Sequence, residues 1–186
     1  IEGEFKIRAI YSPADMAKPA EIEAMVKEAT TKFGRIDILV NNAGIQHVSP
    51  IQNFPPEKWD AVIAVNLSSA FHAVRVALPQ MLARNWGRII NIASAHSLVA
   101  SVDKVAYVAA KHGLVGLTKV MAKEGAQHNV RANLIAPGFV RTPLVDKQIP
   151  EQARALGISE DEVIRNVMLK ETVDGQFTTV QDVAEV

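Results

Sequence analysis

The chain has 186 residues, 48% of them apolar, and its 20 acidic side chains balance its 20 basic ones. This length and composition suit one globular domain, and the balanced charge excludes a strongly basic surface for nucleic acid or an anionic membrane. The absence of cysteine excludes disulfides, thiolate catalysis and sulfur-ligated metals, and it fits a reducing cytoplasm. With no apolar run that spans a bilayer and no signal-like N-terminus, we expect no membrane partner.

The first half of the chain alternates between short apolar runs and amphipathic segments. Residues 5–10 predict a strand, and residues 20–33 predict a helix that follows a proline and stops at a glycine. Residues 36–40 form a compact apolar run, whose near-continuous hydrophobicity indicates a strand in a sheet covered on both faces. A long helical region is expected over residues 56–84.

The second half continues the alternation. Strands are expected over residues 88–92 and 130–135, with a long helix over residues 104–127 between them. The polar stretch at about 140–175 predicts a mobile substrate flap in two helical pieces, and residues 180–186 begin a further helix. Alternating strands and helices predict a parallel sheet with right-handed crossovers, the doubly wound, Rossmann-type α/β class.

Polar or glycine-bearing residues follow the ends of the expected strands. They are Asp15, Asn42-Ala43-Gly44, Ser94 and Pro137-Gly138. Ligands of such sheets bind outside the carboxyl ends of the strands. Each feature alone is typical of a turn, whereas four of them in one chain favour a binding site.

Tyr107 and Lys111 lie four positions apart in the helix that follows Ser94, so they share one helix face. A phenol titrates near pH ~10 and is a poor proton shuttle at neutral pH. A nearby ammonium group favours the phenolate, so we expect Lys111 to lower the pKa of Tyr107. The pair could then exchange a proton with an alcohol or carbonyl oxygen held by Ser94. On spacing alone, an amphipathic tyrosine beside a solvated lysine is the commoner explanation.

Other chemistries find less support. The histidines are scattered without ligand spacing, so no metal site is expected. Ser94 and His96 could suggest a hydrolase, but the segment around them lacks the glycines of a nucleophile elbow.

Five motifs occur in the order and at the intervals that one family shows. They are Asn41-Asn42-Ala43-Gly44, Asn66, Ser94, Tyr107-Val108-Ala109-Ala110-Lys111 and Pro137-Gly138. Through them the chain resembles, over essentially its whole length, the short-chain dehydrogenase/reductase family. The resemblance implies an oxidoreductase in which a nicotinamide cofactor carries the hydride, while the protein positions it and manages one proton.

The resemblance also implies roles for single residues. Tyr107 would be the general acid/base, and Ser94 would bind the reacting oxygen. Lys111 would bind the nicotinamide ribose, and Asn66 would steady a proton-relay water, although a mid-helix asparagine can simply face solvent or bend its helix. The implied cofactor-binding residues lie at the strand ends and in the loops after them: Asp15, Met16, Asn42, Ala43, Gly44, Tyr107, Lys111, Pro137, Gly138, Val140, Thr142 and Leu144.

Four hydrogen-bond donors are expected close to Ser94 and Tyr107, and with these two they form the expected substrate site: Gln46, His96, Lys104 and Gln148. Such donors suit a small carboxylate, although each alone could be a surface or loop residue. Together they resemble the branch of the family that interconverts (R)-3-hydroxybutyrate and acetoacetate with NAD. The family also implies a homo-oligomer, a dimer or tetramer, built on its two long helical regions.

The chain departs from the family at both ends. No glycine-rich turn precedes Phe5, so we expect the first β-α-β unit to be absent, together with the residue that selects NAD over NADP. The last family strand is also expected to be absent. Residues 1–186 would then be a single partial domain with weak dinucleotide binding and a poorly covered sheet, whose apolar strand faces are exposed and whose edge is unpaired. Three alternatives stay open: a reductase of another small keto acid or β-keto substrate, a non-catalytic NAD-binding scaffold, and an inert fragment.

Overall fold

The structure is a computed structural model that describes residues 2–186, with the side chain of Leu144 left outside the described set. Its centre is a three-stranded parallel sheet with strand order β1-β2-β3. The strands are β1 (Ile38–Asn41), β2 (Gly87–Ile92) and β3 (Val130–Ile135). The predicted parallel sheet is confirmed, and these three strands lie within two residues of the predicted limits.

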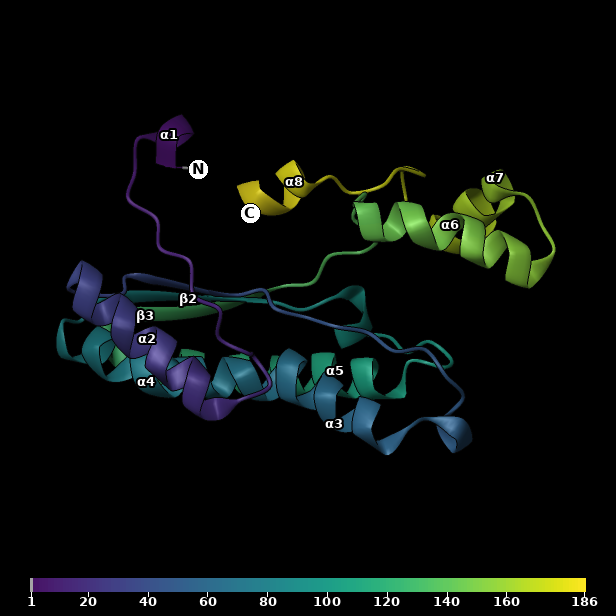
Figure 1. Cartoon of the computed structure of the whole chain (residues 1–186). Helices are drawn as coiled ribbons and strands as arrows, with labels where there is room; N and C mark the ends of the chain where they lie inside the picture. The colour runs from purple at the N-terminus through teal and green to yellow at the C-terminus, as the bar shows by residue number, and fades with distance from the viewer. Residues whose placement is uncertain (1) are drawn as a thin grey trace.

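Three helical segments cover one face of this sheet (Figure 1). They are α2 (Pro19–Phe33), the pair α3 (Pro56–Ile63) and α4 (Ser69–Ala83), and α5 (Val105–Gly125). The common side of the α3–α4 pair and α5 follows from the strand order, because two right-handed crossovers that step in one direction place both connecting helices on the same face. The helix α2 precedes β1 and packs against α4 on that face. The sequence prediction of these helices is confirmed, and α2 ends as predicted at Gly34, whose φ of 83° favours glycine.

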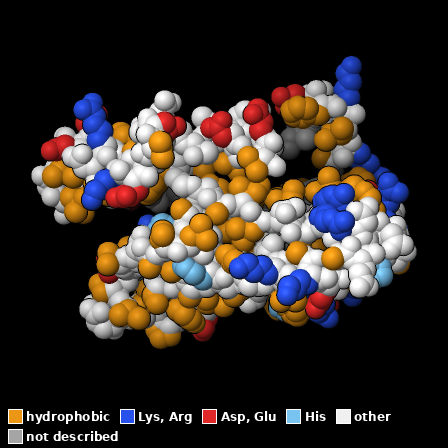
Figure 2. All heavy atoms as spheres, turned by 180° about the vertical axis from the view of Figure 1, so that it is seen from behind, with side chains coloured by type: hydrophobic (Ala, Val, Ile, Leu, Met, Phe, Trp, Pro, Cys, Tyr) orange, Lys and Arg blue, Asp and Glu red, His pale blue; other side chains and the backbone are white. Residues whose placement is uncertain are grey.

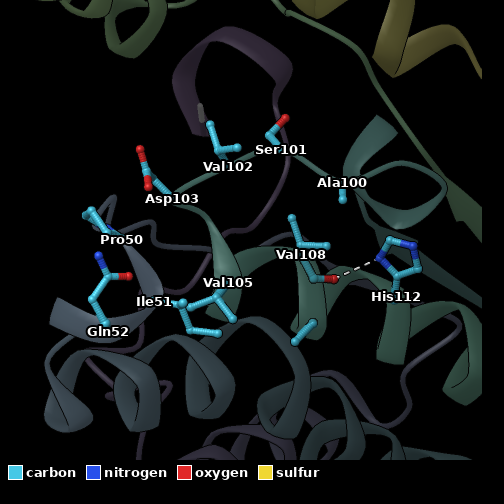
Figure 3. Close-up of a pocket in the computed structure, with 11 residues that line it drawn as sticks. Pro50, Ile51, Gln52, Ala100, Ser101, Val102, Asp103, Val105, Val108 and His112 are labelled. Atoms are coloured by element: carbon cyan, nitrogen blue, oxygen red, sulfur yellow. Dashed lines mark hydrogen bonds between the residues drawn. The ribbon is translucent and has the colours of Figure 1, made fainter.

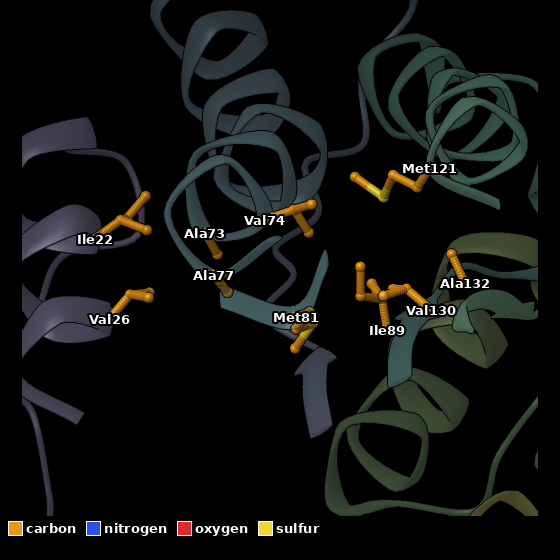
Figure 4. Close-up of a cluster of buried hydrophobic side chains, with 10 residues drawn as sticks. All are labelled: Ile22, Val26, Ala73, Val74, Ala77, Met81, Ile89, Met121, Val130 and Ala132. Atoms are coloured by element: carbon orange, nitrogen blue, oxygen red, sulfur yellow. The ribbon is translucent and has the colours of Figure 1, made fainter. Parts of the chain in front are cut away.

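The main core lies between these helices and the sheet (Figure 4). Its buried side chains come from α2, α4, α5, β2 and β3: Ile22, Val26, Ala73, Val74, Ala77, Met81, Ile89, Met121, Val130 and Ala132. Each fully buried large aliphatic side chain contributes roughly 1.5–3 kcal/mol to folding. This layer therefore holds α5 and the strand ends in fixed relative positions.

The predicted strand over residues 5–10 is wrong. A short helix, α1 (Glu2–Phe5), occupies its start, and the residues after it pair with no strand in the described structure. Ile7 is 54% exposed. A β-strand needs a neighbour for its backbone hydrogen bonds, and this segment does not lie along the sheet.

The apolar run at residues 36–40 indicated a sheet covered on both faces, which is wrong for this chain, whereas the poorly covered sheet expected from the departure at both ends is confirmed. Ile38 and Val40 of β1 are 56% and 52% exposed, because no helix of the described residues packs on their side. Figure 2 shows hydrophobic side chains widely exposed on the molecule seen from behind. Apolar strand residues thus predicted the parallel sheet correctly, but not how far this chain covers it.

A separate C-terminal segment follows β3. It contains α6 (Pro143–Leu156), α7 (Glu160–Val163) and α8 (Val180–Glu185), with a π-helical turn at Ile164–Met168. The predicted break near Gly157 is confirmed, since Gly157 ends α6 with a φ of 67°. The segment has a small core of its own, formed by Val145, Ile149, Val163, Met168 and Leu169. A bridge between Val140 and Thr178 closes its base.

Helical turns of 3₁₀ type lie at Ile51–Asn53, Ala95–Ser97 and Ala126–His128. Among the described residues, one continuous helical region, Pro56–Ala83, is long and apolar enough to cross a membrane, judged by length and composition alone. Core helices of soluble proteins meet the same criterion, and this one contributes four side chains to the main core. Because of that burial, we keep the expectation that no segment spans a membrane.

Candidate active site

Ser94 and Tyr107 approach one another where β2 ends and α5 begins. Ser94 follows β2 by two residues, and its hydroxyl lies close enough to the phenol of Tyr107 to oppose a rise in the phenol pKa. The ring of His96 packs edge-on against the ring of Tyr107, with centroids 5.9 Å apart. The structure therefore brings together the serine and the tyrosine that the sequence singled out.

His96 is fixed between two serines. Its Nδ1 lies 3.2 Å from Ser94 Oγ, and its backbone N–H donates to the same oxygen. Its Nε2 lies 2.8 Å from Ser101 Oγ. Ser101 was missed at the level of sequence, because a serine in a loop of small residues carries no signal of its partner.

Lys111 is buried, with only 4% of its surface exposed. Its Nζ donates to the carbonyl oxygen of Ile92 at 2.8 Å and lies 5.6 Å from the ring centroid of Tyr107. Burial disfavours the charged form and lowers the pKa of Lys111 to about 8. The amine is therefore poised to change its charge close to neutral pH.

The expected lowering of the Tyr107 pKa is wrong for this structure. Burial of the phenol raises its pKa, and the nearby Ser94 hydroxyl opposes this only in part. Desolvation is the larger effect, while Lys111 Nζ is hydrogen-bonded to the Ile92 carbonyl and lies 5.6 Å from the ring centroid of Tyr107.

Asn66 lies in a π-helical turn, Ala64–Ser68, between α3 and α4. Its Oδ1 accepts from the Ile45 N–H at 2.8 Å, and its Nδ2 donates to the Ile45 carbonyl oxygen at 2.9 Å. The side chain is buried, so the alternative that it faces solvent is wrong. Single π turns are frequent at functional sites, and this one presents Asn66 to the loop after β1.

Gly44 lies at the centre of these groups. A Cβ added there would lie 3.8 Å from Asn66 Oδ1 and 3.9 Å from Lys111 Nζ. The loop backbone therefore passes directly over the buried ammonium group. Lys111 has three N–H donors, of which the described protein atoms engage one, so its remaining donors suit the hydroxyls of a nicotinamide ribose. The residues present thus fit that end of a dinucleotide.

The expected substrate donors divide into two groups. His96 and Lys104 are neighbours: burial lowers the pKa of His96, and the charge of Lys104 lowers it further. Burial also lowers the pKa of Lys104. Gln46 is exposed and Gln148 half-buried on α6, and neither side chain makes a hydrogen bond to the described residues. The geometry thus brings two of the four donors together.

The outlying candidates have local partners. Asp15 accepts from the Ala17 N–H at 2.9 Å in a turn before α2, and Met16 packs against the main core. Thr142 caps α6 by accepting from the Val145 N–H. The Pro137 carbonyl accepts from the Ala95 N–H at 2.7 Å, which ties the loop after β3 to the residue after Ser94.

The remaining cofactor candidates lie mostly in exposed loops. Asn42 and Ala43 lie in the exposed loop between β1 and Gly44, Gly138 is exposed, and Val140 forms the bridge to Thr178. The side chain of Leu144 lies outside the described set.

A cavity of about 650 Å³ lies on the other side of the α5 start (Figure 3). Val105, Val108 and His112 of α5 face the loops at Ile51 and Val102 across it. Neither Ser94, Tyr107 nor Lys111 lines this cavity. The candidate active site is therefore distinct from this cavity, and the chemistry of its side chains defines it. Among the described residues, no group of three potential metal ligands occurs.

Comparison with known proteins agrees with this geometry. A family model described as short chain dehydrogenase matches residues 1–153. The D-beta-hydroxybutyrate dehydrogenase of Rhizobium meliloti (strain 1021) is 58% identical over 94% of this chain and 68% of its own length. The enzyme of the same name from Cupriavidus necator is 57% identical, with 93% and 67% covered. The 3-oxoacyl-[acyl-carrier-protein] reductase FabG of Thermotoga maritima is 38% identical, with 75% and 56% covered. The chain belongs to the short chain dehydrogenase family of oxidoreductases.

Proposed function

We propose that this protein oxidises (R)-3-hydroxybutyrate to acetoacetate with NAD and catalyses the reverse reduction. The convergence of Ser94, Tyr107 and Lys111 beside His96 and Lys104 carries the proposal. The first three supply the proton chemistry of an alcohol oxidation, and the last two supply donors for a carboxylate. The two relatives at 57–58% identity, both named D-beta-hydroxybutyrate dehydrogenase, support the choice of substrate.

The proton chemistry centres on Tyr107. In the oxidation, the Tyr107 phenolate takes the hydroxyl proton, while the Ser94 hydroxyl donates a hydrogen bond to the same substrate oxygen. NAD, held in part by Lys111, would supply the acceptor for the hydride that leaves the carbinol carbon. In the reduction, the Tyr107 hydroxyl returns its proton to the ketone oxygen. One proton and one hydride leave the alcohol, so the reaction balances.

Three further groups support this step. Lys111, held on the Ile92 carbonyl, binds the ribose hydroxyls with its remaining N–H donors. With Lys111 in this position, burial still keeps the pKa of Tyr107 above its ordinary value. Asn66 holds the loop at Ile45 through two hydrogen bonds, so we assign its side chain to positioning that loop. A proton-relay water steadied by Asn66 would then bind the backbone of Asn66, because the side chain is engaged by Ile45.

The remaining proposed cofactor contacts lie before α2, in the loops after β1 and β3, and at the start of α6. They are Asp15, Met16, Asn42, Ala43, Gly44, Pro137, Gly138, Val140, Thr142 and Leu144. The preference for NAD over NADP is part of the proposal, together with a cytoplasmic location and a homodimer or homotetramer. Residues 140–175 would be the mobile part of a single domain and would carry Gln148 toward the substrate, while Gln46 approaches it from the loop after Gly44.

The substrate carboxylate lies two carbons from the reacting carbon, and Lys104 and His96 would hold it. The test measures NADH formation from (R)-3-hydroxybutyrate, its S enantiomer and a neutral secondary alcohol. We would run it on this chain and on a chimera completed with the Rhizobium meliloti segments that this chain does not match. We expect Lys104→Met and His96→Ala to lower kcat/KM for the hydroxy acid at least tenfold, which is the loss of one charge-assisted hydrogen bond.

Lys147→Met is the matched control, because Lys147 is exposed on α6. It should leave every substrate unaffected. Equal losses for the hydroxy acid and the neutral alcohol in Lys104→Met would contradict the carboxylate role. A completed chimera that binds NADH but ignores the hydroxy acid would reject the substrate and direct the search to other keto acids or β-keto compounds.

A further inference from the structure

A buried chain of hydrogen bonds runs below the candidate active site, on the helix-covered face of the sheet. Asn41 Nδ2 donates to Asn91 Oδ1 at 2.8 Å, and Asn91 Nδ2 donates to Thr118 Oγ1 at 2.8 Å. The Thr118 hydroxyl donates to the Leu114 carbonyl oxygen at 2.6 Å. All three donors point the same way, so the chain runs from β1 through β2 to the backbone of α5.

The central members of this chain have no access to water. Asn91 is 0% exposed and Thr118 is 6% exposed. Among the described residues, the other hydrogen-bond partner of Asn91 Nδ2 is the sulfur of Met121 at 3.8 Å, a weak acceptor. A buried amide without an oxygen partner is costly. Any slide of α5 along β2 is therefore opposed, because it would separate Asn91 from Thr118.

The chain touches each segment that carries a catalytic candidate. Asn41 ends β1, directly before the loop of Asn42 to Gly44. Asn91 precedes Ile92, whose carbonyl binds Lys111, and lies three residues before Ser94. Thr118 lies seven residues, or about two helical turns, beyond Lys111 and therefore on the same face of α5.

We propose that Asn91 and Thr118 are positioning residues for the reaction. Their hydrogen bond sets the position of α5 along β2 and so aligns Tyr107 and Lys111 with Ser94. Apolar packing alone tolerates small slides, because it is not directional, whereas a hydrogen bond weakens steeply with distance and angle. A displacement of about 1 Å in a reacting group can lower a rate by roughly 100-fold. The proposal rests on the dehydrogenase function proposed above.

The test compares two substitutions of Thr118. Thr118→Val exchanges the hydroxyl for a methyl group of similar size and leaves Asn91 Nδ2 without its oxygen acceptor. Thr118→Ser keeps the hydroxyl. In the completed chimera, we expect Thr118→Val to lower kcat roughly tenfold and Thr118→Ser to stay within about twofold of the parent. The pH midpoint of kcat should also move in Thr118→Val, because the contact between Lys111 and Ile92 changes.

Val26→Ala is the control for stability alone. Val26 is buried in the main core on α2 and has no contact in the hydrogen-bonded chain. At a temperature where all variants are folded, Val26→Ala should keep the parent kcat and pH midpoint. The proposal is overturned if Thr118→Val keeps kcat within twofold, or if Val26→Ala loses as much.

Amide hydrogen exchange gives a readout that does not need turnover. Exchange over residues 105–114 of α5 should be faster in Thr118→Val than in the parent, and unchanged in Thr118→Ser and Val26→Ala. If the parent does not turn over (R)-3-hydroxybutyrate, the proposed substrate fails while exchange still decides whether Thr118 holds this half of α5. Unchanged exchange in Thr118→Val would overturn the proposal on that readout.

Discussion

Lys111 Nζ donates to the carbonyl oxygen of Ile92 at 2.8 Å and so joins the catalytic helix to the end of β2. The carbonyl lies two residues before Ser94, and the lysine lies one helical turn after Tyr107. This single contact therefore fixes the spacing between both sides of the proposed reaction. It also buries a positive charge, which has a measurable consequence for stability.

Burial of Lys111 should make the protein more stable as pH rises from 8 to 10.5. Its pKa is about 8 when folded and returns to 10.5 in the unfolded chain, so the unfolded state binds more protons in this window. Below pH 8, the buried charge lowers the free energy of unfolding by on the order of 3 kcal/mol. Urea unfolding of the parent should show this gain, and unfolding of Lys111→Met should not.

Lys119→Met is the control for this comparison, because Lys119 is exposed on the same helix. Its pH dependence should follow that of the parent. In Lys111→Met, the lost hydrogen bond to Ile92 lowers stability by the same amount at every pH. Any change in the slope of stability against pH therefore comes from the lost titration of Lys111. Parallel curves for the parent and Lys111→Met between pH 8 and 10 would contradict the buried charge.

Tyr107→Phe should lower kcat by about 10³-fold, because it removes the group that we propose exchanges a proton with the reacting oxygen. The phenyl ring keeps the contact with His96, so binding of NADH, followed by its fluorescence, should change little. Tyr11→Phe is a matched control, since Tyr11 is the other tyrosine of the chain and is 88% exposed. A Tyr107→Phe variant that keeps more than a tenth of the parent kcat would exclude Tyr107 as the acid/base.

The sequence predicted the parallel strands and long helices because their signals are local. The apolar run at Val130–Ile135 and the glycine after Phe33 depend on near neighbours in the chain. The prediction of a strand over residues 5–10 was wrong, because an apolar pattern of this kind forms a strand only beside a partner strand. The same holds for Ile38 and Val40, whose burial depends on helices that this chain does not place over them.

The candidate catalytic residues could be singled out because Ser94, Tyr107 and Lys111 occur in a motif with fixed spacing. Their environment could not be predicted, because it depends on contacts between distant segments. The raised pKa of Tyr107 follows from its burial, and the hydrogen bonds of Asn66 to Ile45 join residues 21 apart. The link between Asn91 and Thr118 joins residues 27 apart, and only the helical spacing of Thr118 from Lys111 suggests it.

Two glycines of the α5 region should respond in opposite ways to alanine. Gly116 has no atom within 4 Å of an added Cβ, so Gly116→Ala should raise stability by up to about 1 kcal/mol through helix propensity. An added Cβ at Gly125 would lie 2.9 Å from the Val130 carbonyl oxygen, so Gly125→Ala should lower stability by about 1–3 kcal/mol. Thermal unfolding measures both changes. A stabilised Gly125→Ala would show that α5 and β3 are not packed this closely.

Asn66→Leu should weaken both folding and cofactor binding. The leucine side chain cannot replace the two hydrogen bonds to Ile45, so the N–H and carbonyl of that residue lose their partners. The expected loss is about 1–3 kcal/mol for each group that stays buried. The loop that carries Gly44 then loses its support above Lys111, and the Kd for NADH should rise.

Asn66→Asp is the informative companion, because it keeps an acceptor for the Ile45 N–H and removes the donor to the Ile45 carbonyl. Its stability should lie between those of the parent and Asn66→Leu, with the Kd for NADH in the same order. Asn53, in the exposed turn Ile51–Asn53, provides a control asparagine, and Asn53→Leu should change neither quantity. If Asn66→Leu lowers stability but leaves the Kd for NADH unchanged, the loop at Gly44 does not depend on Asn66 for its position over Lys111.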